Sequence, residues 1–245
     1  MNTKQKEIKA RKDSILAITV GRYISTVAPV SSSFIVKEHL YGLSSATIRN
    51  ILAELEHEGY LTHPHTSAGR IPTQKGYRYY VDNLMNEIQL LEEETTRIKI
   101  EYKKQKLELE ELFDNLSKSI SETTNYTSMI SVDGWDKKLF CRGTSYIVRY
   151  LDYTDIQKIE EILAALDEKE RLLEIINRHL EKRIDIFIGN EMACAQMNSC
   201  SLVISEYKTK KGPSGRIAVL GPTRMNYERV VSAIDYFSSL IEEIY

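Results

Sequence analysis

The sequence predicts an α+β protein in three parts: a helical N-terminal domain, a long connector helix, and a C-terminal domain of mixed helices and strands. Three observations predict this plan. The first 60 residues contain three helical segments separated by short turns. Residues 77–122 contain neither proline nor glycine, which favours a long helix. Beyond residue 126, β-branched and aromatic runs alternate with helical periodicity, as expected for an α+β domain.

The charge of the chain is unevenly distributed. The 245 residues have a net charge of −2, with 42% hydrophobic and 28% charged residues, as in an ordinary protein with a real core. Residues 1–80 contain 11 Lys and Arg against 6 Asp and Glu, and also four of the five histidines. A basic first domain on an acidic remainder predicts a polyanionic partner for the N-terminal part.

A first helix is predicted over residues 4–26, where apolar residues recur at helical spacing and Lys and Arg occupy much of the rest. Pro29 stops regular helix, and the serines at 31–33 offer caps for a second helix from Phe34 to Leu40. Gly42 makes the turn into a third helical segment. Helix, short helix, turn and third helix is the order of a helix-turn-helix motif.

The third helix carries the clearest functional pattern. Ser44 is a good N-cap, and Gly59 can supply the left-handed residue that ends the helix. One apolar stripe consists of Ile48, Ile51, Leu52 and Leu55. The opposite face consists of Ala46, Arg49, Asn50, Ala53 and His57. Small residues let a helix approach a groove closely, and Arg and Asn can read base edges, so this face predicts binding to duplex DNA. The alternative is a surface helix with a solvated polar face.

The residues after the third helix predict a wing. A short apolar entry is followed by polar residues with Gly69 and Arg70, which indicates a tight β-loop with a basic tip. Residues 1–82 are therefore predicted to be a winged helix-turn-helix domain. The candidate DNA-binding residues are Ser44, Ser45, Ala46, Thr47, Arg49, Asn50, Ala53, His57, His63, His65, Thr66, Ser67, Arg70, Lys75 and Arg78. Arg49 and Asn50 are expected to read bases, whereas Arg70, Lys75 and Arg78 are expected to contact phosphates.

Several segments resemble the bacterial HrcA family of heat-inducible transcription repressors. In the first domain they are PVSS (29–32), LSSATIRN (43–50), LEHEGYL (55–61), PHTSAGRIPT (64–73) and GYRYYVD (76–82). A second block comprises CSLVIS (200–205) and LGPTRMNY (220–227). The matches through the third helix and the wing are long and specific, with weaker similarity between the two blocks.

The resemblance implies a homodimeric repressor of chaperone operons that binds the inverted repeat called CIRCE, with the chaperonin GroE as modulator. It also implies a GAF-like α+β domain, which takes residues 123–245 here. The chain is markedly shorter than typical members, and the shortfall is expected between Tyr126 and Lys138. Part of the sheet and a dimerising insertion are therefore expected to be absent or reduced.

Residues 83–122 are predicted to form the connector helix, as part of a helical stretch that starts near residue 73. Steps of four and three join Leu84, Ile88, Leu91, Thr95, Ile98, Tyr102, Gln105, Leu109, Leu112 and Leu116. This heptad seam can form a coiled coil between two copies, or the helix can pack against its own domain.

The C-terminal domain shows alternating strand and helix patterns. Strands are expected at Met129–Val132, Lys138–Phe140 and Ile184–Ile188, and helices at Asp155–Leu180 and Tyr227–Ile244. Ser201–Tyr207 and Arg216–Leu220 are expected to form an antiparallel hairpin.

Other functional classes find little support in the sequence. There is no signal-peptide pattern or long apolar run, so a cytoplasmic protein without a membrane span is expected. Cys141, Cys194 and Cys200 are expected to be reduced, buried thiols. No nucleophile or metal motif is present, so no enzyme, cofactor or metal site is expected. The alternative function is a ligand-sensing regulator whose second domain binds a metabolite, although Gly189–Glu191 and Gly221–Tyr227 suggest turns and caps.

Overall fold

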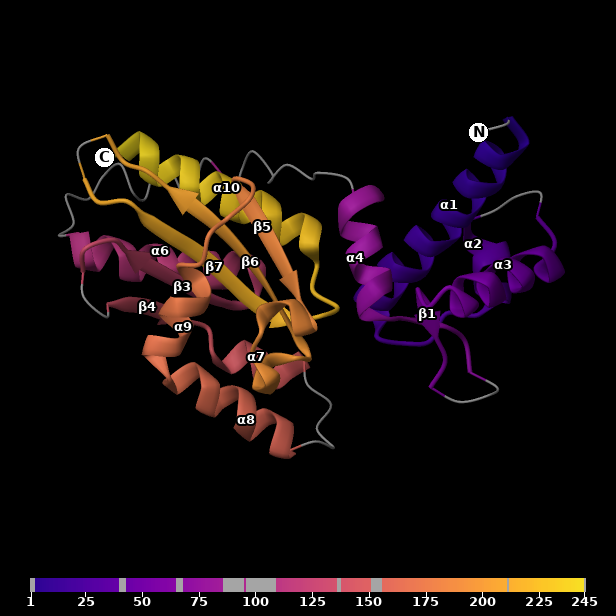
Figure 1. Cartoon of the computed structure of the whole chain (residues 1–245), viewed down its shortest axis with the longest axis horizontal. Coiled ribbons are helices and arrows are strands. Elements are labelled where there is room, and N and C mark those ends of the chain that lie inside the picture. Colours follow the sequence, from indigo (N-terminus) through magenta and orange to yellow (C-terminus); the bar gives the residue numbers. More distant parts are fainter. Residues whose placement is uncertain are drawn as a thin grey trace. The chain divides into compact units, whose positions relative to one another are not determined.

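The computed structural model describes residues 3–39, 43–64, 68–85, 95, 109–135, 138–150, 156–210 and 212–244. The chain divides into two compact units, Met1–Asn86 and Glu87–Tyr245. Each unit has its own helices, strands and apolar core (Figure 1).

The first unit is a small helical domain with a two-stranded wing. Its elements are α1 (Thr3–Thr26), α2 (Ser32–His39), α3 (Ser45–His57), β1 (Leu61–Thr62), β2 (Ile71–Pro72) and α4 (Gln74–Asn83). The core forms where α1 crosses α2 and α3, and it contains Ile15, Leu16, Val20, Ile35 and Ile48. The predicted helices over 4–26 and from Phe34 are confirmed, whereas Leu40 lies outside the described residues.

The predicted wing is confirmed as an antiparallel hairpin. β1 and β2 pair through only two residue pairs, Leu61 with Pro72 and Thr62 with Ile71. A backbone bridge between Val30 and Arg70 extends this ladder to the helical body, with N–O distances of 2.9 and 2.8 Å. Gly69 is required beside this bridge, because a Cβ atom there would lie 2.6 Å from the Val30 backbone.

The helix predicted from residue 73 through the connector is not continuous. α4 ends at Asn83, where the side-chain amide donates to the carbonyl of Tyr79 at 3.1 Å. The backbone N–H of Met85 donates to Tyr80 at 2.8 Å, a bond typical of helix C-termini. Asparagine competes with the backbone for such bonds, which explains an end without proline or glycine. The next helix with more than one described residue is α6 (Leu109–Thr124). It buries Leu112, a residue of the predicted heptad seam, within its own domain.

The second unit contains a five-stranded antiparallel sheet in the order β4-β3-β7-β6-β5 (Figure 1). The strands are β3 (Thr127–Val132), β4 (Leu139–Arg142), β5 (Ile184–Ile188), β6 (Cys200–Tyr207) and β7 (Gly215–Pro222). All five predicted strands are confirmed. Residues 127–142 form β3 and β4 on either side of a short connection, and both strands belong to one continuous sheet.

Helices cover both faces of the sheet. They are α6, α7 (Ser145–Tyr150), α8 (Ile156–Asp167), α9 (Lys169–Ile176) and α10 (Tyr227–Ile244), with short 3-10 helices η1 (Gly189–Met192) and η2 (Ala195–Met197). α6 and α10 cross one face, and α8 and α9 pack against the other through an apolar cluster that includes Met129, Leu202 and Leu220 (Figure 1). The single helix predicted from Asp155 to Leu180 is interrupted at Glu168, whose ψ of 70° is not helical.

The three cysteines are free thiols, as predicted. Cys194 and Cys200 are buried as predicted, whereas Cys141 is only half-buried because it lies on the edge strand β4. Burial raises the pKa of Cys141 to about 11 and that of Cys200 to about 12. Within the described residues, no helix combines the length and the apolar composition that crossing a bilayer requires.

Candidate nucleic-acid interface

The orientation of α3 is fixed at both ends and along one face. The Ser44 hydroxyl accepts from the backbone N–H of Thr47 at 3.1 Å, as its predicted capping role requires. Gly59 has a φ of +77°, and the N–H of Tyr60 donates to the Leu55 carbonyl at 2.9 Å, which completes the left-handed helix end. The inward face is held by Ile48, Leu52 and Leu55, all buried. The opposite face must therefore point to solvent.

That outward face is exposed as predicted. The exposed residues are Ser44, Ala46, Thr47, Arg49, Asn50, Ala53 and His57, and Ser45 is half-buried against Ser32 of α2. Thr47 and Ser44 also share a hydrogen bond of 2.9 Å at the start of the helix. Among the residues that the structure describes, Arg49 and Asn50 have no side-chain partner. Their donors and acceptors are thus available to a ligand beside two alanines that leave room for close approach.

The basic wing residues have partners within the domain that the sequence did not predict. Nδ1 of His63 contacts Oε1 of Glu56, and a guanidinium nitrogen of Arg70 lies 2.7 Å from Oε2 of the same carboxylate. Arg70 is therefore held inside the domain rather than extended into solvent. Three further predicted residues, His65, Thr66 and Ser67, lie outside the described residues.

Lys75 and Arg78 also have partners within the domain. The ammonium group of Lys75 donates to the Glu58 carbonyl at 2.7 Å and lies 4.6 Å from the centre of the Tyr60 ring. Arg78 is 3.3 Å from Asp82, one helical turn away. Lys75 thus caps the end of α3, while its exposed position still leaves its charge near the wing.

No role was predicted for Thr73, although its hydroxyl connects the end of α3 with the start of α4. Its hydroxyl donates to the Gly59 carbonyl at 2.6 Å and accepts from the N–H of Gly76 at 3.1 Å. It therefore ties the end of α3 to the start of α4, just after β2. Gly76 lies so close to Tyr60 that a Cβ atom would meet its carbonyl oxygen at 2.2 Å. A threonine directly before a helical segment was the available signal for this N-cap.

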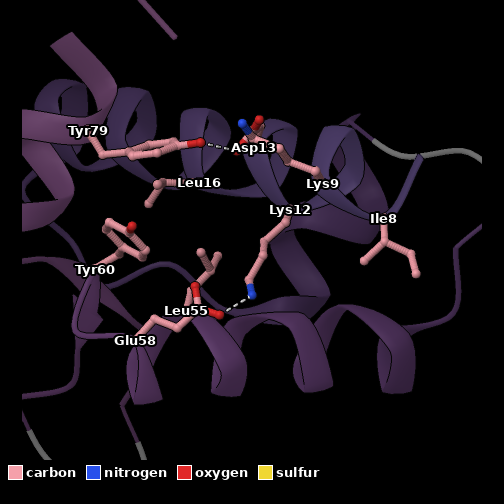
Figure 2. Close-up of a pocket in the computed structure, with 9 residues that line it drawn as sticks. All are labelled: Ile8, Lys9, Lys12, Asp13, Leu16, Leu55, Glu58, Tyr60 and Tyr79. Carbon is pink, nitrogen blue, oxygen red and sulfur yellow. Dashed lines mark hydrogen bonds and ion pairs between the residues drawn. The ribbon is translucent and has the colours of Figure 1, made fainter. Parts of the chain in front are cut away.

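A pocket of about 320 Å³ lies on the α1 side of α3 (Figure 2). Its lining residues are Ile8, Lys9, Lys12, Asp13, Leu16, Leu55, Glu58, Tyr60 and Tyr79. Lys12 pairs with Glu54 of α3 and with Glu58, which follows this helix. Figure 2 shows Lys12 directed at Glu58 and the Tyr79 hydroxyl directed at Asp13, so these four lining side chains are paired with one another.

The polar segments Gly189–Glu191 and Gly221–Tyr227 of the second unit have structural roles. Glu191 accepts from the backbone N–H of Ile188 at 2.8 Å within the η1 turn. Asn226 accepts from the N–H of Arg229 at 3.0 Å and so caps α10, as predicted. Their side chains thus serve a turn and a helix start.

The chain is similar to curated repressors along nearly its whole length. It is 29% identical to the heat-inducible transcription repressor HrcA of Acetivibrio thermocellus, in an alignment of 334 residues that covers 95% of each protein. It is 28% identical to the repressor of that name from Clostridioides difficile, over 96% of this chain and 99% of that protein. Because these alignments exceed the 245 residues of this chain, the relatives carry segments that it lacks.

Structural and family comparisons agree with this result. A crystal structure of a hypothetical protein at 2.2 Å resolution matches with a TM-score of 0.78 and 17% identity, over 96% of this chain and 97% of that one, which shows the fold. The family model for the HrcA protein C-terminal domain matches residues 78–231, more than half of the chain. This protein therefore belongs to the HrcA family, as one of its shorter members.

Proposed function

We propose that this protein is a heat-inducible transcription repressor that binds duplex DNA through α3 and the wing. The observation that carries the proposal is the outward face of α3, where Arg49 and Asn50 are exposed between Ala46 and Ala53 on a helix capped at both ends. The shared family with proteins of that name supports the same function.

In this proposal α3 enters the major groove. Arg49 presents a planar fork of donors that suits the O6 and N7 acceptors of guanine, and Asn50 can bond adenine in a similar way. Ser44 and Thr47 lie at the N-terminus of the helix, where backbone N–H groups and the helix dipole favour a phosphate. The wing then lies along the sugar-phosphate backbone of the DNA, and Lys75 adds positive charge there.

The proposed operator is the inverted repeat CIRCE upstream of chaperone operons, and the proposed active form is a homodimer. An inverted repeat presents two identical half-sites related by a two-fold axis, so two copies of α3 are needed to read it. We assign dimerisation to residues after 83. Sedimentation should give a dimer for the full chain and a monomer for a fragment of residues 1–82.

The proposed modulator is the chaperonin GroE, which would raise the fraction of active cytoplasmic repressor. The sheet of the second unit supports this idea, because β3 pairs with β7 across a long stretch of sequence. Non-local pairing folds slowly and exposes apolar strands in the meantime. Refolding with and without chaperonin, followed by titration of operator DNA, counts the active dimers. An active fraction near one without chaperonin would contradict this part alone.

The central experiment is selection of bound sequences from random duplexes by the purified full chain. We expect an inverted repeat in which each half-site is bound by one winged helix-turn-helix domain. Recovery of unrelated sequences with equal affinity would contradict sequence-specific repression. A parallel thermal-shift screen of metabolites tests the ligand-sensing alternative, which predicts a large stabilisation by one compound.

A further inference from the structure

One carboxylate connects the recognition helix to both sides of the wing. Glu56 lies in the last turn of α3 and keeps about a quarter of its side-chain surface exposed. One of its oxygens contacts Nδ1 of His63, which follows β1. The other lies 2.7 Å from Arg70, which precedes β2. The two ends of the wing loop thus converge on a single side chain of α3.

The wing has few other restraints. Its ladder consists of two residue pairs, too few for independent stability. The backbone of Arg70 is bonded to Val30, which fixes the β2 side of the loop to the helical body. His63 has no such backbone bridge in the described part of the wing, so on the β1 side its contact with Glu56 adds a side-chain restraint to the burial of Leu61.

Glu56 also follows Arg49 by seven residues, which places both on the same side of α3. Its carboxylate therefore lies beside the face that we propose reads bases in the major groove. A free negative charge would weaken binding there, whereas this carboxylate is paired with the guanidinium of Arg70 and contacts the ring of His63. The position makes sense if the carboxylate orients those partners.

We propose that Glu56 is a positioning residue for operator binding, which holds the wing at a fixed distance from the base-reading face of α3. This inference rests on the proposed DNA-binding function. It assigns to Arg70 a role in wing geometry in place of a direct phosphate contact. It also assigns to His63 the matching role on the other strand.

The test compares Glu56→Gln with Glu54→Gln in the full chain. Glu54 is on the same helix, but its carboxylate is 3.3 Å from Lys12 of α1 and does not touch the wing. Both substitutions remove one negative charge from a DNA-binding domain, so electrostatics alone predicts tighter binding for both. Positioning predicts a loss of about tenfold in affinity for the selected duplex with Glu56→Gln only, because a preorganised contact is lost.

A second readout does not depend on DNA. Hydrogen exchange at the amides of Val30 and Arg70 reports how firmly the wing is docked, and we expect faster exchange in Glu56→Gln but not in Glu54→Gln. If the wild-type chain binds no duplex, the proposed function fails, and the exchange rates decide whether Glu56 positions the wing.

His63→Gln gives an independent variant in case Glu56→Gln does not fold. We expect it to weaken binding less than Glu56→Gln, and the double variant to bind no worse than Glu56→Gln, since both act through one contact. Unchanged or tighter binding by Glu56→Gln, together with unchanged exchange, would overturn the proposal. Full additivity of the two substitutions would do the same.

Discussion

The hydroxyl of Tyr79 on α4 donates a 2.8 Å hydrogen bond to the carboxylate of Asp13 on α1. Burial and then this bond raise the pKa of Tyr79 to about 12, above its ordinary value of 10.0. The bond links the first and the last helix of the winged-helix domain across the rim of the pocket (Figure 2). The bond thus holds α4 against α1 within this domain.

This bond predicts a loss of stability in alkali. Below pH 10 Tyr79 is protonated in the folded and unfolded states, and its contribution is fully present. As the pH rises from about 10 to about 12, the unfolded tyrosine ionises first, so the free energy of unfolding falls. Tyr79→Phe should lower stability by about 1 kcal/mol at pH 7 and reduce this alkaline loss.

Denaturant titrations at pH 7 and through the alkaline range provide the measurement. Tyr146→Phe is a suitable control, because its ring lies against Arg149 in the other domain. Burial also raises the pKa of Tyr207 in the sheet domain, so part of the alkaline loss should persist in every variant. An alkaline profile of Tyr79→Phe identical to wild type would show that the bond does not stabilise the domain.

Base reading by α3 predicts selective losses of affinity. Arg49→Ala and Asn50→Ala should each cost about 1–3 kcal/mol on the selected duplex and relax specificity at the bases they contact. Arg171→Ala, which removes one arginine from α9 of the other domain, should leave binding unchanged. Competition binding against duplexes with single base changes measures both effects. Equal losses on selected and random DNA would indicate phosphate contacts only.

Two glycines predict opposite effects of the same substitution. Gly69→Ala places a Cβ atom 2.6 Å from the Val30 backbone, so it should displace the wing and weaken operator binding. Gly21 lies within α1 with nothing within 4 Å of a Cβ atom. Gly21→Ala should therefore stabilise the domain by about 0.5–1 kcal/mol, since alanine favours helix.

Thermal unfolding of both variants, paired with binding to the selected duplex, tests this contrast. Gly21→Ala also controls for the added methyl group. Normal operator affinity in Gly69→Ala would mean that the Val30 bridge does not determine the position of the wing.

The raised pKa values of two thiols predict that they react slowly with thiol reagents at neutral pH. Burial holds the pKa of Cys141 near 11 and that of Cys200 near 12, so little thiolate exists at pH 7. A disulfide reagent should therefore modify the native chain slowly, with half-buried Cys141 reacting first and the buried pair only on unfolding. Mass spectrometry after timed labelling measures the order. Rapid modification of Cys200 in the native chain would contradict its burial.

Local patterns in the sequence predicted most of the fold. Ser44, Gly59 and the stripe from Ile48 to Leu55 were enough to place α3 and its outward face, because capping and periodicity act within one helix. The strands of the second domain followed in the same way from β-branched runs. Two helix ends were missed, at Asn83 and at Glu168, since neither has a proline or glycine to mark it.

The candidate site was predicted less completely than the fold. The positions of Arg49 and Asn50 follow from helical spacing alone. The partners of Arg70 and His63 depend on the register of the wing against α3, which brings Glu56 to both of them. That register depends on how the wing packs against α3 in the folded domain, whereas the sequence pattern indicates only that the wing is basic. The phosphate contact of Arg70 stays a prediction, whereas its ion pair with Glu56 could not be predicted from the sequence.

The position of β3 has a consequence for synthesis of the chain. β3 lies between β4 and β7, and all six of its residues are buried. During translation it meets β4 almost at once, but residues 215–222 emerge from the ribosome only after α7, α8, α9, η1, η2 and the strands β5 and β6. The winged-helix domain needs no such distant partner and can fold early. Each nascent chain therefore passes through an interval in which its winged-helix domain is folded while β3 still lacks one of its two neighbours.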